Sequence, residues 1–221
     1  MQDYDHEKGA ARADFCRLLA ACYYQPGPEF SEEKVFDSMR GAAARIHPEL
    51  ATGVRRLSTE FSAEGLESLL VDYTRLFLGP VQMIARPYGS AWLQEDGRLM
   101  QDSTMAVMDL YGQGGFEMDE TFRELPDHIA AELEFLYLLI FQENQACLRG
   151  DPGALSETIG LRQRFLDRHL GRWVGPFTAA VTAGALSGFY RQLAELTDRF
   201  VRMEAGGGKA PRISIEARSS R

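Results

Sequence analysis

The chain has 221 residues, of which 45% are hydrophobic and 25% charged, so it can bury a sizeable core and is not disordered as a whole. Its formal net charge is -8, and residues 1–204 carry -11 because residues 205–221 carry four basic side chains and one acidic. This acidic balance disfavours nucleic acid as a partner and favours a basic peptide.

Three cysteines, Cys16, Cys22 and Cys147, form no C-x-x-C pair, which indicates neither a disulfide framework nor a thiolate zinc site. The polar start MQDYDHEK lacks the pattern of a secretory signal, and no stretch approaches the roughly 18 apolar residues of a membrane helix. We therefore expect a cytoplasmic protein with reduced thiols and no stable membrane insertion.

Hydrophobic residues recur at helical spacing along most of the chain, and proline or glycine ends several of the periodic segments. The predicted helices cover residues 10–24, 31–46 (with Ser31 as N-cap), 48–58, 65–78, 102–111, 125–142, 155–173, 176–183 and 189–203. Residues 81–99 contain helix breakers and are expected to form a long ordered loop that carries Tyr88 and Trp92.

No alternating strand pattern and no internal repeat rise above background. We predict an all-α, single-domain helical bundle of roughly ten helices over residues 1–204. A flexible tail over residues 205–221 is expected to follow, because it is rich in glycine and poor in apolar side chains.

The segment 125–142, LPDHIAAELEFLYLLIFQ, has the broad apolar stripe of a central core helix. Pro126 suits a first helical turn, Asp127 suits the positive end of the helix dipole, and His128 adds a titratable group. The preceding acidic segment 116–124 would lie over this helix start. We therefore expect the ligand at this helix start to be cationic.

Six segments together carry a family resemblance that spans nearly all of the ordered chain. They are YTRLFLGP (73–80), RPYGSAWL (86–93), QDSTMAV (101–107), PDHIAAELEFL (126–136), FLDRHLGRWVGPF (165–177) and FYRQLAELTDRFV (189–201). In their order and spacing the chain resembles the TorD/DmsD family, cytoplasmic chaperones that mature molybdenum-containing redox enzymes exported by the twin-arginine pathway.

The resemblance implies an all-helical TorD-like domain that binds the twin-arginine signal of a client and holds it until the molybdopterin cofactor is inserted. It assigns peptide binding to the Leu-Phe pair of L-F-x-G-P, to a Pro-aromatic pair and to an Asp-His pair. With Tyr73 and Glu124 added, the predicted set is Tyr73, Leu76, Phe77, Pro87, Tyr88, Glu124, Asp127 and His128. The family often reads Glu-Pro-x-Asp-His and has Trp in place of Tyr88, so these departures bear on which client is bound.

The residues support the same chemistry independently of the family. A twin-arginine signal presents two guanidinium groups and an apolar segment that tends to become helical, so its receptor needs carboxylates beside an apolar surface. The body of the client's catalytic subunit is a further expected partner, and no cofactor of the chain itself is expected. The sequence leaves the oligomeric state open between a monomer and a segment-exchanged dimer. It also leaves open whether the protein binds a guanine nucleotide or contacts the cofactor-loading machinery.

Structural explanations compete with each of these assignments. Asp127 could simply cap the helix, and His128 could simply form hydrogen bonds with its neighbours. Leu76 and Phe77 could be ordinary core residues, and Tyr88 could serve to attach its loop to the body of the domain.

Two other function classes stay open as well. One is a helical adaptor that joins folded partners, and the other is a metal-dependent enzyme using His128 and Glu132, for which a third ligand is missing. Because the sequence has neither a P-loop nor a G-x-S-x-G motif, we predict that the protein is not an enzyme.

Overall fold

The structure, a computed structural model, describes residues 5–28, 30, 34–79, 83–94, 99–100, 102–119 and 122–206. Within these ranges the chain forms ten α-helices and one π-helical turn, and its β-pairing is limited to an isolated bridge between Tyr88 and His128. The predicted all-α architecture is confirmed.

The helices differ widely in length, from one turn to six. In chain order they are α1 (His6–Ala21), α3 (Val35–Ile46), α4 (Pro48–Glu64), α5 (Leu66–Tyr73), the π-helical turn η1 (Thr74–Leu78), α6 (Ser90–Leu93), α7 (Asp102–Gly114), α8 (Ile129–Arg149), α9 (Pro152–Arg168), α10 (Leu170–Gly184) and α11 (Gly188–Gly206).

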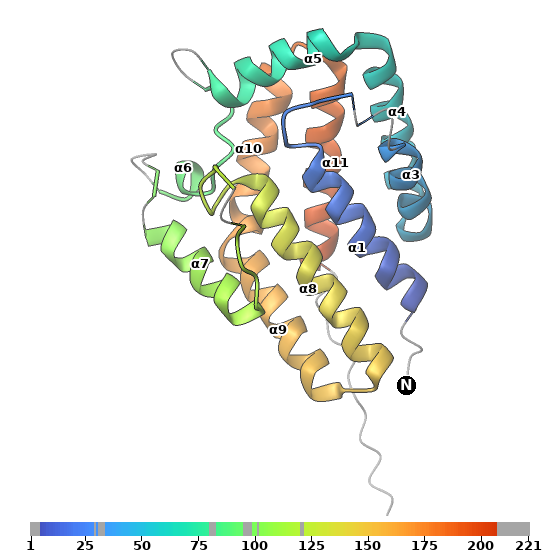
Figure 1. Cartoon of the computed structure of the whole chain (residues 1–221), viewed down its shortest axis with the longest axis vertical. Coiled ribbons are helices and arrows are strands. Elements are labelled where there is room, and N and C mark those ends of the chain that lie inside the picture. Colours follow the sequence, from blue (N-terminus) through green and yellow to red (C-terminus); the bar gives the residue numbers. More distant parts are fainter. Residues whose placement is uncertain are drawn as a thin grey trace, which may run out of the picture.

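Helices α1 and α8 lie side by side in the front layer of the bundle, with α10 and α11 behind them (Figure 1). Helix α3 packs on α1, α4 packs on α3 and α11, and α9 packs on α8 and α10. Helix α5 crosses the top of the view, while α6 and α7 lie on the opposite side from α3 and α4. In Figure 1 the start of α8 lies near the upper middle of the view, below α5 and beside α6.

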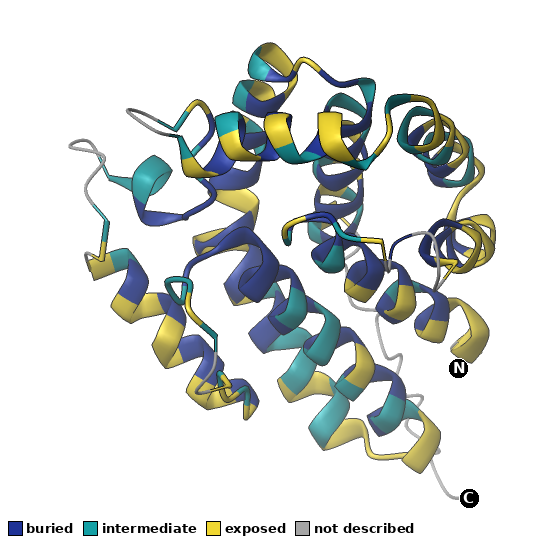
Figure 2. Ribbon diagram, turned by 45° about the horizontal axis from the view of Figure 1, so that its top comes forward, coloured by how far each residue is buried: buried dark blue, intermediate teal, exposed yellow. Residues whose placement is uncertain are grey.

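Helix α8 is the central element that its hydrophobic stripe predicts. Leu133, Phe135, Leu136, Leu139 and Ile140 are all completely buried, and the dark inner side of this helix is visible in Figure 2. Side chains on more than one face are buried because neighbouring helices cover both flanks of α8. The periodic stripe thus identifies the core of the domain.

The predicted start of α8 is wrong by four residues. The helix begins at Ile129 with His128 as its N-cap, whereas Pro126 and Asp127 lie in a turn closed by a 3.0 Å hydrogen bond from the His128 N–H to the Leu125 carbonyl. The Asp127 carbonyl accepts from the Gly89 N–H at 2.8 Å. Because a distant segment holds this carbonyl, Pro126 does not occupy the first helical turn.

The predicted break before Pro176 is also wrong. The chain breaks at His169, with φ -132° and ψ -99°, and Pro176 lies inside α10. The imidazole of His169 bonds to the Ser103 carbonyl at 3.0 Å and lies beside Glu132. These contacts from two other helices hold the break in place, and α10 then buries Trp173 on its inner face.

Several other boundaries extend beyond their predicted ends. Helix α4 continues to Glu64, and α7 continues to Gly114, after which Gly115 adopts a φ of +67°. Helix α11 continues to Gly206, so the tail predicted from position 205 begins inside a helix. Residues 207–221 and the predicted N-cap Ser31 lie outside the described residues.

A buried ionic network joins four helices on the side of the bundle away from the start of α8. Arg12 of α1 donates from Nε to Glu204 of α11 at 2.8 Å, and Arg162 of α9 pairs with Glu143 of α8. Arg162 also donates to the Glu204 carbonyl at 2.9 Å. Since charges at this depth are costly unless paired, the network requires all four partners.

Candidate functional site

The turn before α8 is anchored by Asp127, whose side chain is completely buried. One carboxylate oxygen, Oδ2, accepts from the Ser90 N–H at 2.7 Å and from the Thr104 hydroxyl at 3.3 Å. The other oxygen, Oδ1, makes no hydrogen bond within the described residues. Asp127 therefore connects α6, α7 and α8 and retains one free acceptor.

The segment 86–93 forms the wall beside this turn. The Ile129 N–H donates to the Pro87 carbonyl at 2.8 Å, and the Trp92 indole donates to the Arg86 carbonyl at 2.8 Å. Tyr88 pairs with His128 through the isolated β-bridge. The structure thus brings the predicted Pro-aromatic and Asp-His pairs together, although about 40 residues separate them in sequence.

His128 caps α8 with its own ring. Its Nδ1 accepts from the Ala130 N–H at 3.2 Å, so the neutral ring carries its proton on Nε2. Burial lowers the pKa of His128 to about 4, although the charges of Glu124 and Asp127 oppose this shift. The imidazole is consequently uncharged near neutral pH.

Three aromatic rings surround the imidazole of His128. The ring of Tyr88 is 5.5 Å from it, and the rings of Tyr24 and Phe122 are each 6.5 Å away. Tyr24 and Phe122 are only partly buried, so part of the aromatic surface faces solvent.

Two carboxylates complete this region, and each accepts a hydrogen bond from a tyrosine. The Tyr88 hydroxyl donates to Glu124 and the Tyr24 hydroxyl to Glu134, both at 2.7 Å. Burial, followed by the bonded carboxylate, raises the pKa of Tyr88 and of Tyr24 far above the ordinary value. Both phenols therefore remain donors. We call the set Tyr24, Tyr88, Phe122, Glu124, His128 and Glu134 the mouth.

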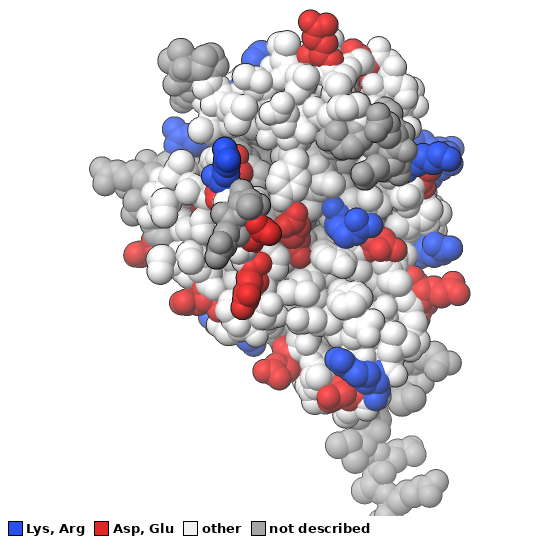
Figure 3. Space-filling model, viewed as in Figure 1, with Lys and Arg blue, Asp and Glu red and all other residues white. Residues whose placement is uncertain are grey.

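The surroundings of the mouth are mainly acidic, although the exposed Arg123 lies between Phe122 and Glu124 in the chain. Glu117 and Asp119 are exposed on the loop that leads to α8, and Glu124 and Glu134 are partly exposed. Figure 3 shows acidic side chains gathered on this face, over the loop and the start of α8. The predicted acidic segment is thus present at the helix start, apart from residues 120–121, which lie outside the described residues.

The Leu-Phe pair occupies a different environment from the mouth. Leu76 is completely buried and Phe77 is 2% exposed, with its ring 5.5 Å from that of Tyr190. The exposed apolar side chains of this stretch are instead Val71 and Leu78. In this conformation Leu76 and Phe77 belong to the core, as the competing structural explanation expects.

Tyr73, at the end of α5, borders the mouth, because its hydroxyl is close enough to interact with Glu124 and Tyr88. Its side chain is 6% exposed, and burial together with the charge of Glu124 raises the pKa of its hydroxyl to about 12. Of the eight predicted residues, Tyr88, Glu124 and His128 belong to the mouth, Asp127 and Pro87 support it, and Tyr73 borders it. Leu76 and Phe77 lie in the core.

Sequence reasoning did not identify Tyr24 and Phe122 as site residues. Tyr24 is the last residue of a predicted amphipathic helix, and its hydrogen bond to Glu134 joins positions 110 residues apart. Phe122 is one of two aromatic residues in the acidic segment 116–124, and this combination of aromatic and acidic side chains was the available signal.

A second polar cluster lies beneath the segment 86–93. Glu132 is completely buried, its Oε1 is 2.9 Å from Nδ1 of His169, and its Oε2 accepts from the Trp173 indole at 3.0 Å. Burial lowers the pKa of His169, but the Glu132 carboxylate, the Ser103 carbonyl and the charge of Asp127 together outweigh this effect, so the net pKa is raised. Both ring nitrogens face acceptors, so we assign the charged imidazolium.

The two residues of the metal-enzyme alternative, Glu132 and His128, make other contacts in this structure. Glu132 is paired with His169, and the Nδ1 of His128 is used for helix capping. Across the described ranges, no group of three or more His, Cys, Asp or Glu side chains is arranged to hold a metal ion.

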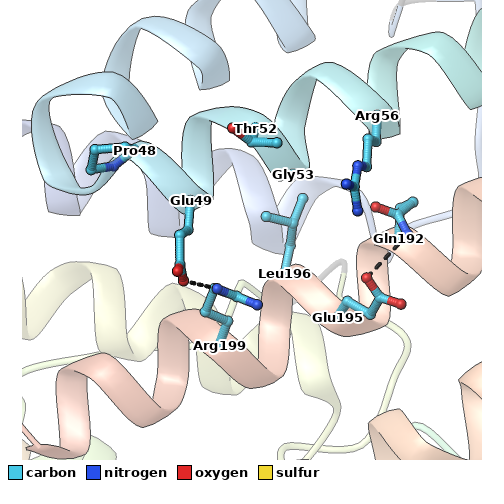
Figure 4. A pocket seen from close by; sticks show the side chains of 9 residues that line it. All are labelled: Pro48, Glu49, Thr52, Gly53, Arg56, Gln192, Glu195, Leu196 and Arg199. Atoms are coloured by element: carbon cyan, nitrogen blue, oxygen red, sulfur yellow. Dashed lines mark hydrogen bonds and ion pairs between the residues drawn. The ribbon is translucent and has the colours of Figure 1, made fainter.

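A cleft of about 340 Å³ lies elsewhere, between α4 and α11 (Figure 4). Leu196 forms its floor close to Gly53, Arg199 pairs with Glu49, and Gln192 bonds to Glu195 at 3.1 Å. The lining contains two arginines and two glutamates. This balance of charge gives the cleft no preference for a cation, in contrast to the mouth.

The chain is thus an all-helical domain in which acidic and aromatic side chains gather at the mouth. No helix among the described residues combines the length and apolar character needed to cross a membrane.

Comparison with known proteins identifies the family. The family model described as nitrate reductase delta subunit matches residues 43–179. The chain is 29% identical over 210 residues to a perchlorate reductase assembly chaperone protein of Dechloromonas aromatica, covering 88% of each chain. It is 28% identical over 155 residues to the chaperone protein TorD of Vibrio atlanticus, covering 70% of each.

Two further matches agree with this assignment. The Tat proofreading chaperone DmsD of Salmonella typhi is 31% identical over 126 residues, covering 55% of this chain and 62% of that one. A solved structure from Archaeoglobus fulgidus, named a putative redox enzyme maturation protein, shares the fold, with a TM-score of 0.51 at 20% identity over 91% of this chain and 96% of that chain.

The chain belongs to the TorD/DmsD-type family of redox-enzyme maturation chaperones. The relatives are chaperones rather than catalysts, which supports the prediction that the chain is not an enzyme.

Proposed function

We propose that this maturation chaperone acts in the cytoplasm and binds the twin-arginine signal of a molybdopterin-containing oxidoreductase before the client is exported. The mouth is the observation that carries this proposal, because it combines carboxylates with aromatic rings at the start of α8. The name of the relative called a Tat proofreading chaperone points in the same direction.

The mouth has the groups that a guanidinium requires. Glu124 and Glu134 each accept one phenol hydrogen bond, and a carboxylate has further lone pairs for an arginine side chain. The rings of Tyr24 and Phe122 are partly exposed, so a cation can also lie against their faces. A pair of arginines therefore finds two carboxylates within one aromatic surface.

Asp127 has a less direct part in this proposal. Its carboxylate is buried in the present conformation, but Oδ1 accepts no hydrogen bond from any residue that the structure describes. Contact with a guanidinium requires the segment 86–93 to move away, whereas anchoring of that segment requires no movement. Direct contact stays a prediction of the family resemblance.

Titration of a fluorescent twin-arginine peptide tests the proposal. Glu124→Gln and Glu134→Gln should each weaken binding by about 1 to 3 kcal/mol, which corresponds to the loss of a charge-assisted hydrogen bond. A peptide with Lys-Lys in place of Arg-Arg should bind less tightly, and added salt should reduce affinity. A helical adaptor with a flat apolar interface would show neither dependence.

The matched control is Glu49→Gln, which removes the same charge from the cleft between α4 and α11. It should leave peptide affinity unchanged, because the overall charge changes equally but the mouth does not. If Glu49→Gln and Glu124→Gln lose the same peptide affinity, net charge alone would explain the attraction, and this result would contradict a specific site at the mouth.

A further inference from the structure

Residues 207–221 have the opposite charge to the rest of the chain, and we call them the basic segment. They carry four basic side chains and one acidic, whereas the whole chain has a net charge of -8. Three of the basic residues are arginines, Arg212, Arg218 and Arg221, and two isoleucines follow the first of them closely. The basic segment therefore combines guanidinium groups with apolar side chains, which are the two kinds of group that the mouth can hold.

The described chain leads into the basic segment beside α8. Helix α11 ends at Gly206, and two residues earlier Glu204 lies in the buried ionic network. Arg162 joins Glu204 to α8, because it donates to the Glu204 carbonyl at 2.9 Å and pairs with Glu143. The basic segment thus starts near a known point in the second half of α8.

The distance from this point to the mouth follows from the geometry of α8. Glu134, a mouth residue, lies nine residues before Glu143, which is about 14 Å along the helix and half a turn away, on the opposite face. The width of α8, about 10 Å, and the intervening Arg162 lengthen the path. The path from Gly206 to the mouth is therefore about 30 Å.

Chain length separates the basic residues of the segment into two pairs. An extended chain covers at most about 3.6 Å per residue, so Arg218, twelve residues beyond Gly206, can lie as far as about 40 Å from it. Arg221 reaches still farther. Lys209 and Arg212 are limited to about 11 Å and about 22 Å, which is too short for the mouth.

The charges around the mouth favour the basic segment as an occupant. Glu117, Asp119, Glu124 and Glu134 outnumber Arg123, the one cationic side chain in the described part of the loop before α8. Glu124 and Glu134 each accept one phenol hydrogen bond and have further lone pairs for a guanidinium. Two arginines of one segment can therefore pair with two carboxylates, beside aromatic rings that are partly exposed.

We propose that the basic segment binds the mouth of its own chain through Arg218 and Arg221 and competes there with the signal of the client. This inference rests on the proposed function and adds a regulation of the same site. A short tether gives the segment an effective concentration of about 1 mM at the mouth. With an affinity of about 0.5 mM, the segment occupies the mouth about two-thirds of the time and weakens signal binding about threefold.

Peptide titration with full-length variants tests the competition. Arg218→Gln/Arg221→Gln should bind a twin-arginine peptide about threefold more tightly than wild type does, a difference of about 0.7 kcal/mol. A contact this weak should change the melting temperature by at most about 3 °C.

The matched control is Lys209→Gln/Arg212→Gln, which removes the same charge from residues that cannot reach the mouth. Its affinity for the peptide should equal that of wild type. Equal tightening in both double variants would show that net charge alone explains the gain, and this result would overturn the proposal. Unchanged affinity in Arg218→Gln/Arg221→Gln would overturn it as well.

Backbone amide resonances test the contact without any client peptide. The signals of Tyr24, Phe122 and Glu134 should differ between wild type and Arg218→Gln/Arg221→Gln, whereas the signal of Gly53, in the cleft between α4 and α11, should not. The difference should shrink in about 1 M salt, where charges are screened within about 3 Å. A difference that grows with protein concentration would assign the occupant to a second copy of the chain and overturn the intramolecular contact.

The two measurements separate this inference from the proposed function. Identical amide signals in wild type and Arg218→Gln/Arg221→Gln, in a protein that binds the twin-arginine peptide, would overturn the contact and leave the proposed function intact. Amide signals that depend on the basic segment, in a protein that does not bind the peptide, would support the contact but overturn the proposed function and the competition.

Discussion

Substituting His128 by asparagine should change how the stability of the domain depends on pH. In the folded protein, burial lowers the pKa of His128 from an ordinary value of 6.5 to about 4. The unfolded chain therefore binds a proton between these pH values while the folded protein does not. The histidine contributes stability above pH 6.5 that is lost as the pH falls to about 4.

The size of this effect follows from the two pKa values. At 1.36 kcal/mol per pKa unit, the difference between 6.5 and about 4 corresponds to about 3 kcal/mol. His128→Asn removes the titrating group and keeps a side chain that can cap α8. Between pH 7.5 and pH 4, wild type should thus lose about 3 kcal/mol more unfolding free energy than the variant does.

Urea denaturation at several pH values measures this difference, because the carboxylates common to both proteins cancel in the comparison. His47→Asn is the matched control, since His47 caps α4 in the same way but is exposed. Parallel pH profiles for wild type and His128→Asn would refute the idea that the mouth holds a neutral, desolvated imidazole.

Three further predictions concern stability. Arg162→Leu should cost about 3 to 5 kcal/mol because the buried Glu143 loses its close partner and keeps only the more distant Arg12, at 3.8 Å, among the described residues. Arg199→Leu, in an exposed pair, should cost at most about 1 kcal/mol by chemical denaturation. Gly89→Ala should lower the unfolding free energy by about 1 to 3 kcal/mol, because the new Cβ would lie 2.9 Å from Glu132 and 3.0 Å from Trp173. In the control Gly41→Ala the new Cβ meets no atom within 4 Å, so this variant should be neutral or stabilising. Deletion of residues 207–221, which contain few apolar side chains, should leave the melting temperature nearly unchanged, and a drop of several degrees would contradict this.

Local periodicity was sufficient to predict the fold because the core residues of α8 and α11 recur at helical spacing. Such a stripe requires a partner surface whatever the order of the helices. The helix break at His169 could not be predicted in this way, because it depends on contacts with Glu132 and Ser103 from other helices. Pro176 gave the stronger local signal, but the packing of Trp173 and its neighbours overrides it.

The site was only partly predictable for a similar reason. The sequence placed Asp127, His128 and Glu124 together because they are neighbours in the chain. It did not predict that Asp127 is buried, because the burial comes from the segment 86–93. Nor did it predict that Tyr24 approaches Glu134, since no local pattern records that contact.

The burial of Asp127 leaves two physical explanations for any loss of peptide binding in Asp127→Asn. If its carboxylate acts by anchoring the segment 86–93, the loss arises through Tyr88, whose hydroxyl bonds to Glu124 at the mouth. Asp127→Asn and Tyr88→Phe should then be non-additive in peptide affinity, with a coupling energy of about 0.5 to 3 kcal/mol.

The same cycle with Glu134→Gln provides the contrast. Glu134 bonds to Tyr24 and is on α8 rather than on the anchored segment, so its effect should add to that of Asp127→Asn within about 0.5 kcal/mol if Asp127 acts only by anchoring. Unchanged stability of Asp127→Asn, combined with additivity in both cycles, would instead favour direct contact between Asp127 and the guanidinium. Peptide titrations and parallel melts of the single and double variants distinguish these two roles.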